Sequence, residues 1–257
     1  MSDGWVPPES LRETLKRLLA PPGPYAAYRY RRELRQGERE IHLVGWLADP
    51  RRVAIDVGAN KGVYTYALLK AGCEVHAFEP NPKAFGVLDR WARRRAHLHR
   101  QALSDRSGEA VLMVPRNSRG YSNQGASLSP ERLGAQAFGA VTVETLRLDD
   151  AGIDNVGFMK IDVEGFELQV LRGANETLKR DRPTLLVELE EKHTKRKLAE
   201  MVAEICAYGY RCLALAGGVL TDFEALDLAV SHDPARRPDY IFNFIFLPTS
   251  APAAPRL

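Results

Sequence analysis

The segment Val53-Ala-Ile-Asp-Val-Gly-Ala-Asn-Lys-Gly62 constrains the fold of this chain more than any other part of the sequence. An apolar run that ends near Asp56 and breaks into Gly58, Asn60 and Gly62 predicts a buried strand that turns directly into a helix. Glycine lets the backbone approach a bound molecule without an intervening Cβ atom, and a helix N-terminus offers unpaired N–H groups to an anion. The segment therefore indicates a turn over a small nucleotide-like ligand, with a plain structural turn as the alternative.

The same turn distinguishes between kinds of cofactor. A dinucleotide-binding turn reads G-x-G-x-x-G, and its later glycines admit a pyrophosphate. Here the three glycine positions hold Gly58, Asn60 and Val63, so pyrophosphate binding is disfavoured. S-adenosylmethionine instead carries a carboxylate, an ammonium, a sulfonium and a ribose diol, and Asp56 is the candidate to face its cationic end. The turn therefore favours S-adenosylmethionine.

An acid after the next predicted strand strengthens this interpretation. Residues 74–78 are expected to form that strand, and Glu79 follows it, 23 positions after Asp56. At a spacing of about 20 residues, an acid at the tip of the next strand accepts hydrogen bonds from ribose hydroxyls. Glu79 is thus the candidate ribose ligand.

The composition is that of a globular protein. With 257 residues, of which 45% are hydrophobic, we expect one α/β domain with an N-terminal extension. A net charge of +3 is too small to favour a nucleic-acid partner. The arginine clusters around residues 29–39 and 90–100 are interpreted as solvated helix faces.

No stretch approaches the ~20 apolar residues of a membrane span. The first residues, Met-Ser-Asp-Gly-Trp, have neither the basic nor the apolar region of a secretion signal. We therefore expect a cytoplasmic protein without a membrane span, and the sequence assigns it no oligomeric state.

The order of the predicted elements favours a mostly parallel sheet. Two helices are expected first, at residues 9–20 and 25–46. Strand and helix then alternate over residues 53–57, 62–71, 74–78, 82–94 and 97–102, and again over residues 156–161, 166–179, 184–189, 196–208, 210–216 and 241–247.

The middle of the chain departs from this alternation. Strands are expected at residues 109–114 and 141–146, and they flank a long segment, residues 115–139, that is rich in Gly, Ser, Asn and Arg. A loop of this length is commonly functional, and we expect it to be a mobile cover over an acceptor site.

Acidic residues follow four of the predicted strands. Ligands of such sheets lie beyond the carboxyl ends of the strands, where this sequence places Asp56, Glu79, the pair Asp162 and Glu164, and the pair Glu188 and Glu190. Because Glu188 and Glu190 are two positions apart, an extended chain points both to one side. Glu164 and Glu190 are candidates for binding substrate, with helix capping as the structural alternative.

Asp162, Glu188 and His193 are the candidate catalytic residues. Asp162 is expected to orient the substrate or the methionine ammonium. Glu188 or His193, in a predicted polar loop, would take the proton from an attacking hydroxyl, and His193 is preferred because a pKa near ~6.5 lets it accept a proton at neutral pH. The acids would also suit a divalent cation, but metal dependence is not favoured and no residue is assigned as a ligand.

Seven short motifs occur in order along the chain. The most specific are Phe78-Glu-Pro-Asn-Pro82 and Met159-Lys-Ile-Asp-Val-Glu-Gly165, and the others are Asp56-Val-Gly-Ala-Asn-Lys-Gly62, Ala102-Leu-Ser-Asp105, Val170-Leu-Arg-Gly-Ala174, Val187-Glu-Leu-Glu190 and Asn243-Phe-Ile-Phe-Leu247. Together they resemble the FkbM family of S-adenosylmethionine-dependent methyltransferases. The resemblance covers about residues 52–247, which leaves residues 1–51 as an N-terminal helical extension and residues 248–257 as a flexible tail.

This resemblance implies a Rossmann-like class I methyltransferase fold, with a seven-stranded, mostly parallel sheet and helices on both faces. It also implies O-methylation of a small-molecule or glycan acceptor, that is, a sugar or glycan hydroxyl or a natural product. The stretch Glu188-Leu-Glu-Glu-Lys-His193 is similar to a variant more usual among glycan-related members. The cofactor-binding positions it implies are Asp56, Gly58, Asn60, Gly62, Glu79 and Pro80, with Ala102, Leu103 and Ser104 near the adenine.

Two other classes stay open as alternatives. A nucleic-acid (RNA) methyltransferase can share the fold, but adenine N6 chemistry usually places an Asn or Asp, two prolines and an aromatic residue where this chain has Asp162-Val-Glu-Gly165. Cytosine C5 chemistry needs a cysteine after proline, and none of the three cysteines has that context. A non-catalytic S-adenosylmethionine-binding protein would need the first turn and Glu79, but not the later acids.

Overall fold

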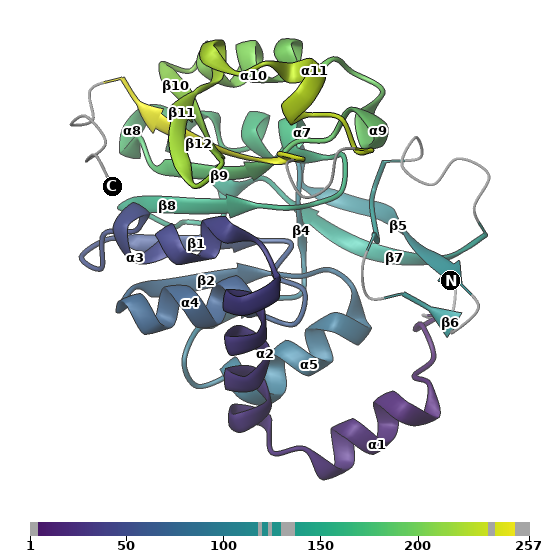
Figure 1. The fold of residues 1–257 in the computed structure, drawn as a ribbon. Coiled ribbons are helices and arrows are strands. Elements are labelled where there is room, and N and C mark those ends of the chain that lie inside the picture. The colour runs from purple at the N-terminus through teal and green to yellow at the C-terminus, as the bar shows by residue number, and fades with distance from the viewer. Residues whose placement is uncertain (1–4, 118–119, 123–124, 130–136, 236–239, 250–257) are drawn as a thin grey trace.

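The computed structural model describes residues 5–117, 120–122, 125–129, 137–235 and 240–249. Its centre is an eight-stranded sheet with the order β11-β10-β12-β9-β8-β1-β2-β3 (Figure 1). The strands are β1 (Val53–Val57), β2 (Glu74–Phe78), β3 (His97–His99), β8 (Val156–Ile161), β9 (Thr184–Glu188), β10 (Tyr210–Ala216), β11 (Val219–Asp222) and β12 (Asn243–Pro248). The α/β architecture expected from the sequence is confirmed.

Most neighbouring strands of this sheet are parallel. Strands β3, β2, β1, β8 and β9 run in one direction, whereas β12 is antiparallel to both β9 and β10. Seven of the strands correspond to the expected ones. The eighth, β11, pairs antiparallel with β10 across the turn at Gly217 and Gly218. The sequence prediction missed β11 because its four residues form too short a run to show a strand pattern.

Helices cover both faces of the sheet (Figure 1). One face carries α2 (Pro22–Gln36), η1 (Arg39–Leu43), α3 (Val44–Leu47), α4 (Val63–Ala71) and α5 (Pro82–Ala92). The other carries α7 (Glu167–Arg172), α8 (Asn175–Asp181) and α10 (Leu198–Cys206). Four short helices join these elements: η2 (Leu148–Asp150), α9 (Glu191–Thr194), η3 (Phe223–Ala225) and α11 (Leu228–Ser231).

Three expected elements are interrupted. The helix expected at residues 25–46 begins at Pro22, because proline fits the first turn of a helix, and ends at Gln36, and η1 and α3 follow it. The helix expected at residues 166–179 is divided into α7 and α8 around Gly173. The strand expected at residues 97–102 is divided between β3 and β4 (Ala102–Leu103), which belong to different sheets.

A second sheet lies beside the carboxyl ends of the central strands (Figure 1). Its order is β4-β7-β5-β6, with β5 at Gly108–Asn117, β6 at Gly120–Tyr121 and β7 at Phe138–Leu146. Both strands expected here are present and longer than predicted, so the ends of the expected cover, residues 115–139, belong to the sheet. Residues 118–119, 123–124 and 130–136 of that segment lie outside the described residues.

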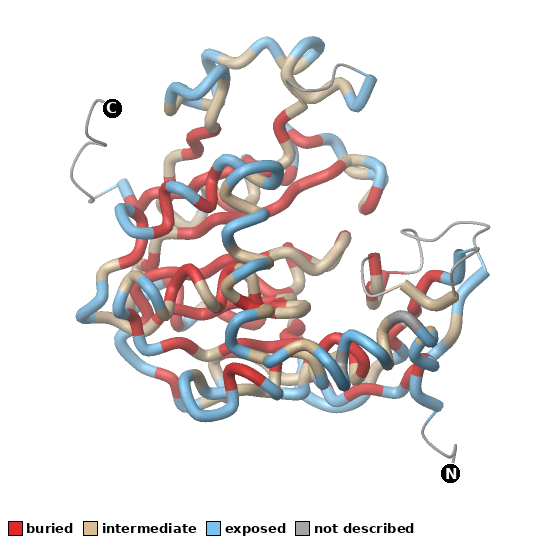
Figure 2. Tube along the Cα trace, turned by 60° about the horizontal axis from the view of Figure 1, so that its bottom comes forward, coloured by how far each residue is buried: buried red, intermediate tan, exposed pale blue. Residues whose placement is uncertain are grey.

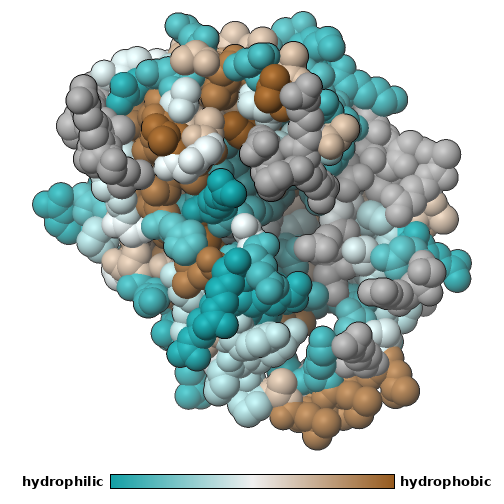
Figure 3. Space-filling view, viewed as in Figure 1, coloured by the Kyte–Doolittle hydropathy of each residue, from teal (hydrophilic) through white to brown (hydrophobic). Residues whose placement is uncertain are grey.

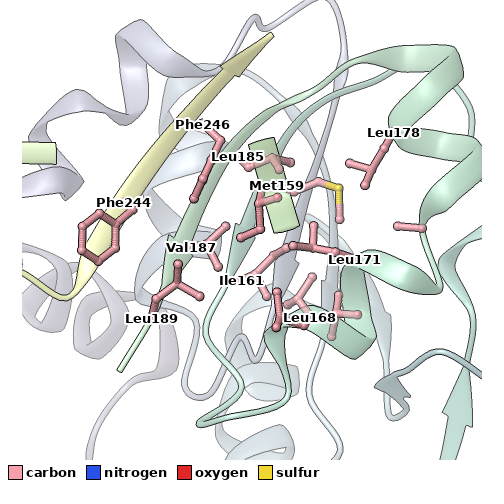
Figure 4. Packing of buried hydrophobic residues seen from close by; sticks show 14 of the residues in the cluster. Met159, Ile161, Leu168, Leu171, Leu178, Leu185, Val187, Leu189, Phe244 and Phe246 are labelled. Carbon is pink, nitrogen blue, oxygen red and sulfur yellow. The ribbon is translucent and has the colours of Figure 1, made fainter. Parts of the chain in front are cut away.

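Alternating side chains of the central strands fill two apolar cores. Met159 and Ile161 of β8 pack on the side of α7, α8 and α10 (Figure 4). Phe158 packs on the opposite side with Leu186. All six residues of β8 are buried, and Figure 2 shows the buried strands inside a more exposed layer of helices. Burial on both faces explains the continuous apolar run of β8, in which Lys160 is the one charged residue.

The N-terminal extension is only partly packed on the sheet domain. Helix α2 packs through Ala26 and through Tyr30, whose ring lies 5.1 Å from that of Tyr66. Helix α1 (Leu11–Leu19) projects away from the sheet (Figure 1). Figure 3 shows an apolar area at the lower edge, where α1 lies, and its exposed leucines are Leu11, Leu15, Leu18 and Leu19.

The described part of the chain contains no helix with the length and apolar character of a membrane span. Of the expected C-terminal tail, Pro248 belongs to β12, and residues 250–257 lie outside the described residues.

Replacing either of two glycines by alanine should change the free energy of unfolding, in opposite directions at the two positions. At Gly86, inside α5, no atom lies within 4 Å of an added Cβ, so Gly86→Ala raises the free energy of unfolding by about 0.5–1 kcal/mol. At Gly173 an added Cβ would lie 1.9 Å from the backbone oxygen of Ser104, so Gly173→Ala lowers it by about 1–3 kcal/mol. Urea denaturation measures both variants, and a shift of the same sign in both would contradict the packing at Gly173.

Candidate active site

A cavity of about 710 Å³ opens at the carboxyl ends of the central strands. The tips of β1, β2, β8 and β9, the second sheet and residues 125–128 line it. Ten of the expected site residues are in this lining: Gly58, Asn60, Glu79, Pro80, Ala102, Leu103, Asp162, Glu164, Glu188 and Glu190. Four other expected residues are absent from the described lining: Asp56, Gly62, Ser104 and His193.

The turn after β1 is fixed by contacts with neighbouring strand tips. The backbone N–H groups of Gly58 and Ala59 both donate to the carbonyl oxygen of Phe78, at 3.0 Å each. Gly58 has φ +77°, and an added Cβ would lie 1.9 Å from the carbonyl oxygen of Asp162. Glycine is therefore required by the close approach of β8, a reason that the sequence interpretation, based on ligand approach alone, did not include.

Glu79 joins this turn to the tip of β2. Its Oε2 accepts from the backbone N–H of Asn60 and its Oε1 from that of Asn81, both at 2.7 Å. Burial raises the pKa of Glu79 to about 7, although these hydrogen bonds oppose the shift. Each carboxylate oxygen has a second lone pair, so Glu79 retains the capacity to accept from a diol in the cavity. The Gly58 turn and this acceptor pair together fit the ribose end of S-adenosylmethionine.

Asp56 belongs to the scaffold under the turn. It is 2% exposed and accepts a hydrogen bond of 2.5 Å from Thr65 of α4. Burial raises the pKa of Asp56 to about 6. Strand alternation directs this side chain toward α4 and away from the cavity. The expectation that Asp56 faces the cationic end of the ligand is therefore not met.

Gly62 and Ser104 also occupy structural positions. Gly62 begins α4, and an added Cβ would lie 2.5 Å from side-chain atoms of both Leu88 and Trp91. Ser104 is buried, and its N–H donates to the carbonyl oxygen of Leu146 in the second sheet. Both residues support the loops behind the cavity.

The carboxyl groups of Asp162 and Glu188 meet at the tips of β8 and β9, with oxygen atoms within 4.8 Å of each other. Burial raises the pKa of both, and the charge of Asp162 raises that of Glu188 well above its usual range. The ammonium of Lys160 opposes both shifts. Carboxyl groups whose pKa is raised toward neutrality by burial are suited to proton transfer.

Lys160 lies beneath this pair and is fully buried. Its Nζ donates to Oδ1 of Asn243 at 2.9 Å and lies 3.9 Å from Oε2 of Glu38. Burial lowers the pKa of Lys160, but the surrounding carboxylates outweigh it and raise the pKa overall. Lys160 therefore remains protonated at neutral pH.

His193 lies in the short helix α9 and is 3% exposed, so the expectation of a polar loop is wrong. Its Nε2 lies 3.4 Å from a carboxylate oxygen of Glu164 and 3.7 Å from one of Glu190. His193 is therefore outside the described lining and lies next to two acids that belong to it. Tertiary packing of α9 against Gly165, whose added Cβ would lie 2.9 Å from the carbonyl oxygen of His193, explains this burial.

Glu190 faces the cavity from the end of β9. Lys192 forms an ion pair with it, and the hydroxyl of Tyr240 donates to it at 2.6 Å. Burial raises the pKa of Glu190, but these two contacts lower it overall. Glu190 is therefore ionised, and Tyr240 and Phe242 extend this side of the cavity with aromatic rings.

Part of the expected cover contacts the strand tips. Residues 125–128 line the cavity, and Oγ of Ser127 donates to the carbonyl oxygen of Glu164 at 2.7 Å. The N–H of Ser127 also donates to Met113 of β5. These contacts agree with a covering position, and the expected mobility of the segment stays a prediction.

The sequence interpretation did not name several lining residues, and Glu38, Lys192, Tyr240 and Phe242 are among them. It also assigned no role to Lys160 or Asn243. A lysine inside an apolar strand is itself a signal, because a buried ammonium needs a partner. Glu38 has no comparable signal, since it is one of several acids between charged helices.

Three groups of possible metal ligands exist among the described residues, and two of them lie at the cavity. Glu164, Glu188 and His193 form one and Glu38, Asp162 and Glu188 the other, with ligand atoms within 4.8 Å of one another. The ammonium of Lys160 already supplies a positive charge to the second group. A divalent cation therefore remains the less favoured interpretation.

Comparison with known proteins agrees with this geometry. The model of the Methyltransferase FkbM domain matches residues 56–212. The chain is 31% identical to 2-O-methyltransferase NoeI of Sinorhizobium fredii, over 54% of this chain and 64% of the relative. It is 29% identical to hexuronic acid methyltransferase AglP of Haloferax volcanii, over 57% of this chain and 60% of the relative. It is also 29% identical to 31-O-demethyl-FK506 methyltransferase FkbM of Streptomyces tacrolimicus, over 64% of this chain and 75% of the relative. The chain thus spans less than two thirds of the length of the first two relatives.

The family match covers more than half of the chain, from the turn after β1 to β10. The chain belongs to the FkbM methyltransferase family. Its mostly parallel sheet with helices on both faces is the Rossmann-like fold that the sequence motifs implied.

The pKa of Glu79 predicts a pH dependence of stability. Because the pKa is about 7 in the folded protein and 4.5 is its ordinary value, the folded state holds the proton more tightly. The resulting stabilisation is present below about pH 4.5 and is lost as the pH rises through about 7. The glutamine in Glu79→Gln cannot titrate. Between pH 5 and 8 the free energy of unfolding of this variant should therefore fall by about 2 kcal/mol less than that of the wild type.

Urea denaturation at the two pH values measures this difference. Glu109→Gln, on the exposed surface of β5, is the matched control and should keep the wild-type dependence. The same dependence in Glu79→Gln and in the wild type would contradict the raised pKa.

Proposed function

We propose that this protein is an S-adenosylmethionine-dependent O-methyltransferase that acts on a hydroxyl of a sugar, a glycan or a natural-product small molecule. The observation that carries the proposal is the cavity in which the Gly58 turn and Glu79 lie beside the half-buried Asp162 and the buried Glu188. Family membership supports the methyl transfer.

On the donor side, Glu79 accepts the ribose hydroxyls, and Ala102 and Leu103 lie beside the adenine. Asn60 is held toward the cavity by its backbone bond to Glu79. When bound, S-adenosylmethionine supplies a methyl group on a positively charged sulfur. The residues of the chain then contribute mainly alignment of the two reactants.

On the acceptor side, Glu164 and Glu190 present carboxylates and Tyr240 presents an aromatic ring. Carboxylates accept hydrogen bonds from hydroxyl groups, and a ring face packs on the apolar face of a sugar. The names of the relatives, a 2-O-methyltransferase and a hexuronic acid methyltransferase, support a sugar acceptor.

In this proposal the pair Asp162 and Glu188 removes the proton from the acceptor hydroxyl. Both lie in the cavity lining, whereas His193 is buried behind Glu164 and Glu190. The sequence interpretation preferred His193 as the base. We now propose that His193 positions Glu164 and Glu190, and that the carboxyl pair takes the proton.

The two alternatives are less well supported. A non-catalytic binding protein has no need to keep two carboxyl groups together at the strand tips, because placing the buried Glu188 beside Asp162 is costly. A nucleic-acid methyltransferase remains disfavoured by the motif Asp162-Val-Glu-Gly165 and by the small net charge.

The donor assignment predicts binding and turnover. The wild type should bind S-adenosylmethionine in calorimetry and form S-adenosylhomocysteine when a hydroxyl acceptor such as a uronic acid is present. Glu79→Ala should weaken donor binding at least tenfold, because hydrogen bonds to a charged group contribute about 1.5–3 kcal/mol. Glu74→Ala, at the exposed start of the same strand, should bind as the wild type does. A wild type that binds no S-adenosylmethionine would refute the proposal.

The base assignment predicts a loss of turnover without a loss of binding. Glu188→Gln should lower kcat by about 10²- to 10⁴-fold and leave donor affinity within about threefold. The wild-type rate should rise with pH through one apparent pKa of the coupled pair. Glu200→Gln, on the exposed side of α10, is the control. If His193→Gln lost as much turnover while Glu188→Gln kept it, the base would be His193.

A further inference from the structure

Glu38 reaches the cavity from outside the matched family domain. It follows Gly37, which ends α2, and precedes η1, so it belongs to the N-terminal extension. Its backbone N–H donates to the side chain of Glu33 at 3.2 Å. Its side chain, 21% exposed, is part of the cavity lining.

Two hydrogen bonds fix one oxygen of this carboxylate. Oε2 of Glu38 accepts from the hydroxyl of Tyr64 at 2.6 Å and from Nδ2 of Asn243 at 3.0 Å. The opposite side of the same amide, Oδ1 of Asn243, accepts from Lys160. The amide is thereby oriented with its donor toward Glu38. Within the described part of the chain, no hydrogen bond is found to Oε1, the other oxygen of Glu38.

The position of Glu38 within the cavity points to the amino-acid end of the donor. A carboxylate oxygen of Glu38 lies within 4.8 Å of ligand atoms of both Asp162 and Glu188. Asp162 in turn lies directly against the Gly58 turn. Glu79, Ala102 and Leu103, which were assigned to the ribose and adenine, belong to the tip of β2 and to the second sheet.

Carboxyl groups outnumber cations at this point of the cavity. Glu38, Asp162 and Glu188 are three acidic groups, and among the described residues Lys160 is the cation that faces all three. A ligand that brings a positive charge would stabilise the ionised form of these acids. S-adenosylmethionine brings an ammonium group on its amino-acid end.

We infer that Glu38 binds the ammonium group of S-adenosylmethionine, so that the N-terminal extension completes the donor site. The inference rests on the proposed function. Tyr64 and Asn243 hold the carboxylate in place, and Oε1 accepts from the ammonium. The extension is then part of the binding site, because the matched domain, residues 56–212, does not contain this carboxylate.

Calorimetry with two ligands tests the assignment in the full chain. S-adenosylhomocysteine carries the ammonium, whereas 5′-methylthioadenosine has the same nucleoside and a neutral thioether but no amino acid. Glu38→Gln should weaken S-adenosylhomocysteine binding about 10- to 100-fold and change 5′-methylthioadenosine binding less than twofold. The matched control is Glu40→Gln, two positions away in η1, whose carboxylate is buried outside the described lining. It should leave both affinities unchanged.

Each result is decisive. Equal weakening of both ligands in Glu38→Gln would show that Glu38 only shapes the cavity, and unchanged binding of both would show that it is no ligand. Either result would overturn this inference and leave the proposed function intact, since the wild type would still bind S-adenosylmethionine. A wild type that binds neither ligand would overturn the proposed function itself.

Discussion

The buried ammonium of Lys160 is the interaction on which the rest of the site depends. It lies in the middle of the central sheet, where a charge is unstable without opposite charges and hydrogen bonds. Asn243 and Glu38, 205 positions apart, meet there to supply them. The charge of Lys160 in turn limits how far burial raises the pKa of Asp162 and Glu188. One side chain thereby joins the last strand, the extension and the pair of acids.

The arrangement of two sheets explains how one cavity would hold both reactants of the proposed reaction. Parallel strands bring their carboxyl ends to one edge, so acids from distant segments gather there. The second sheet holds residues 125–128 over that edge, and Ser127 fastens them to the carbonyl oxygen of Glu164. In the proposed reaction the nucleoside side and the acceptor side share one wall, in which Asp162, after β8, lies between Glu79, after β2, and the glutamates at the end of β9 in the sheet order.

The expected site residues that line the cavity include those whose position follows from the strand pattern alone. Glu79, Asp162 and Glu188 end or follow buried strands, and the edge of a parallel sheet places such residues in the cavity whatever the loops do. His193 and Asp56 were assigned from their chemistry, but the burial of His193 depends on the packing of its helix α9 against Gly165, and that of Asp56 on its contact with α4. The sequence alone does not show that a histidine in a charged stretch, or a carboxylate in an apolar strand, is kept from contact with a ligand. Neighbouring elements decided that neither lies in the cavity lining.

The sequence alone determined the strand-to-helix alternation, the mostly parallel sheet and the acids at its edge, because these follow from local periodicity and from turns marked by glycine. It also carried the family motifs. The tertiary structure decided which carboxylates lie together, which residues only support the loops, and that Glu38 enters the cavity. Those outcomes depend on distances between segments that are far apart in the chain, and a pattern of neighbouring residues contains no information about such distances.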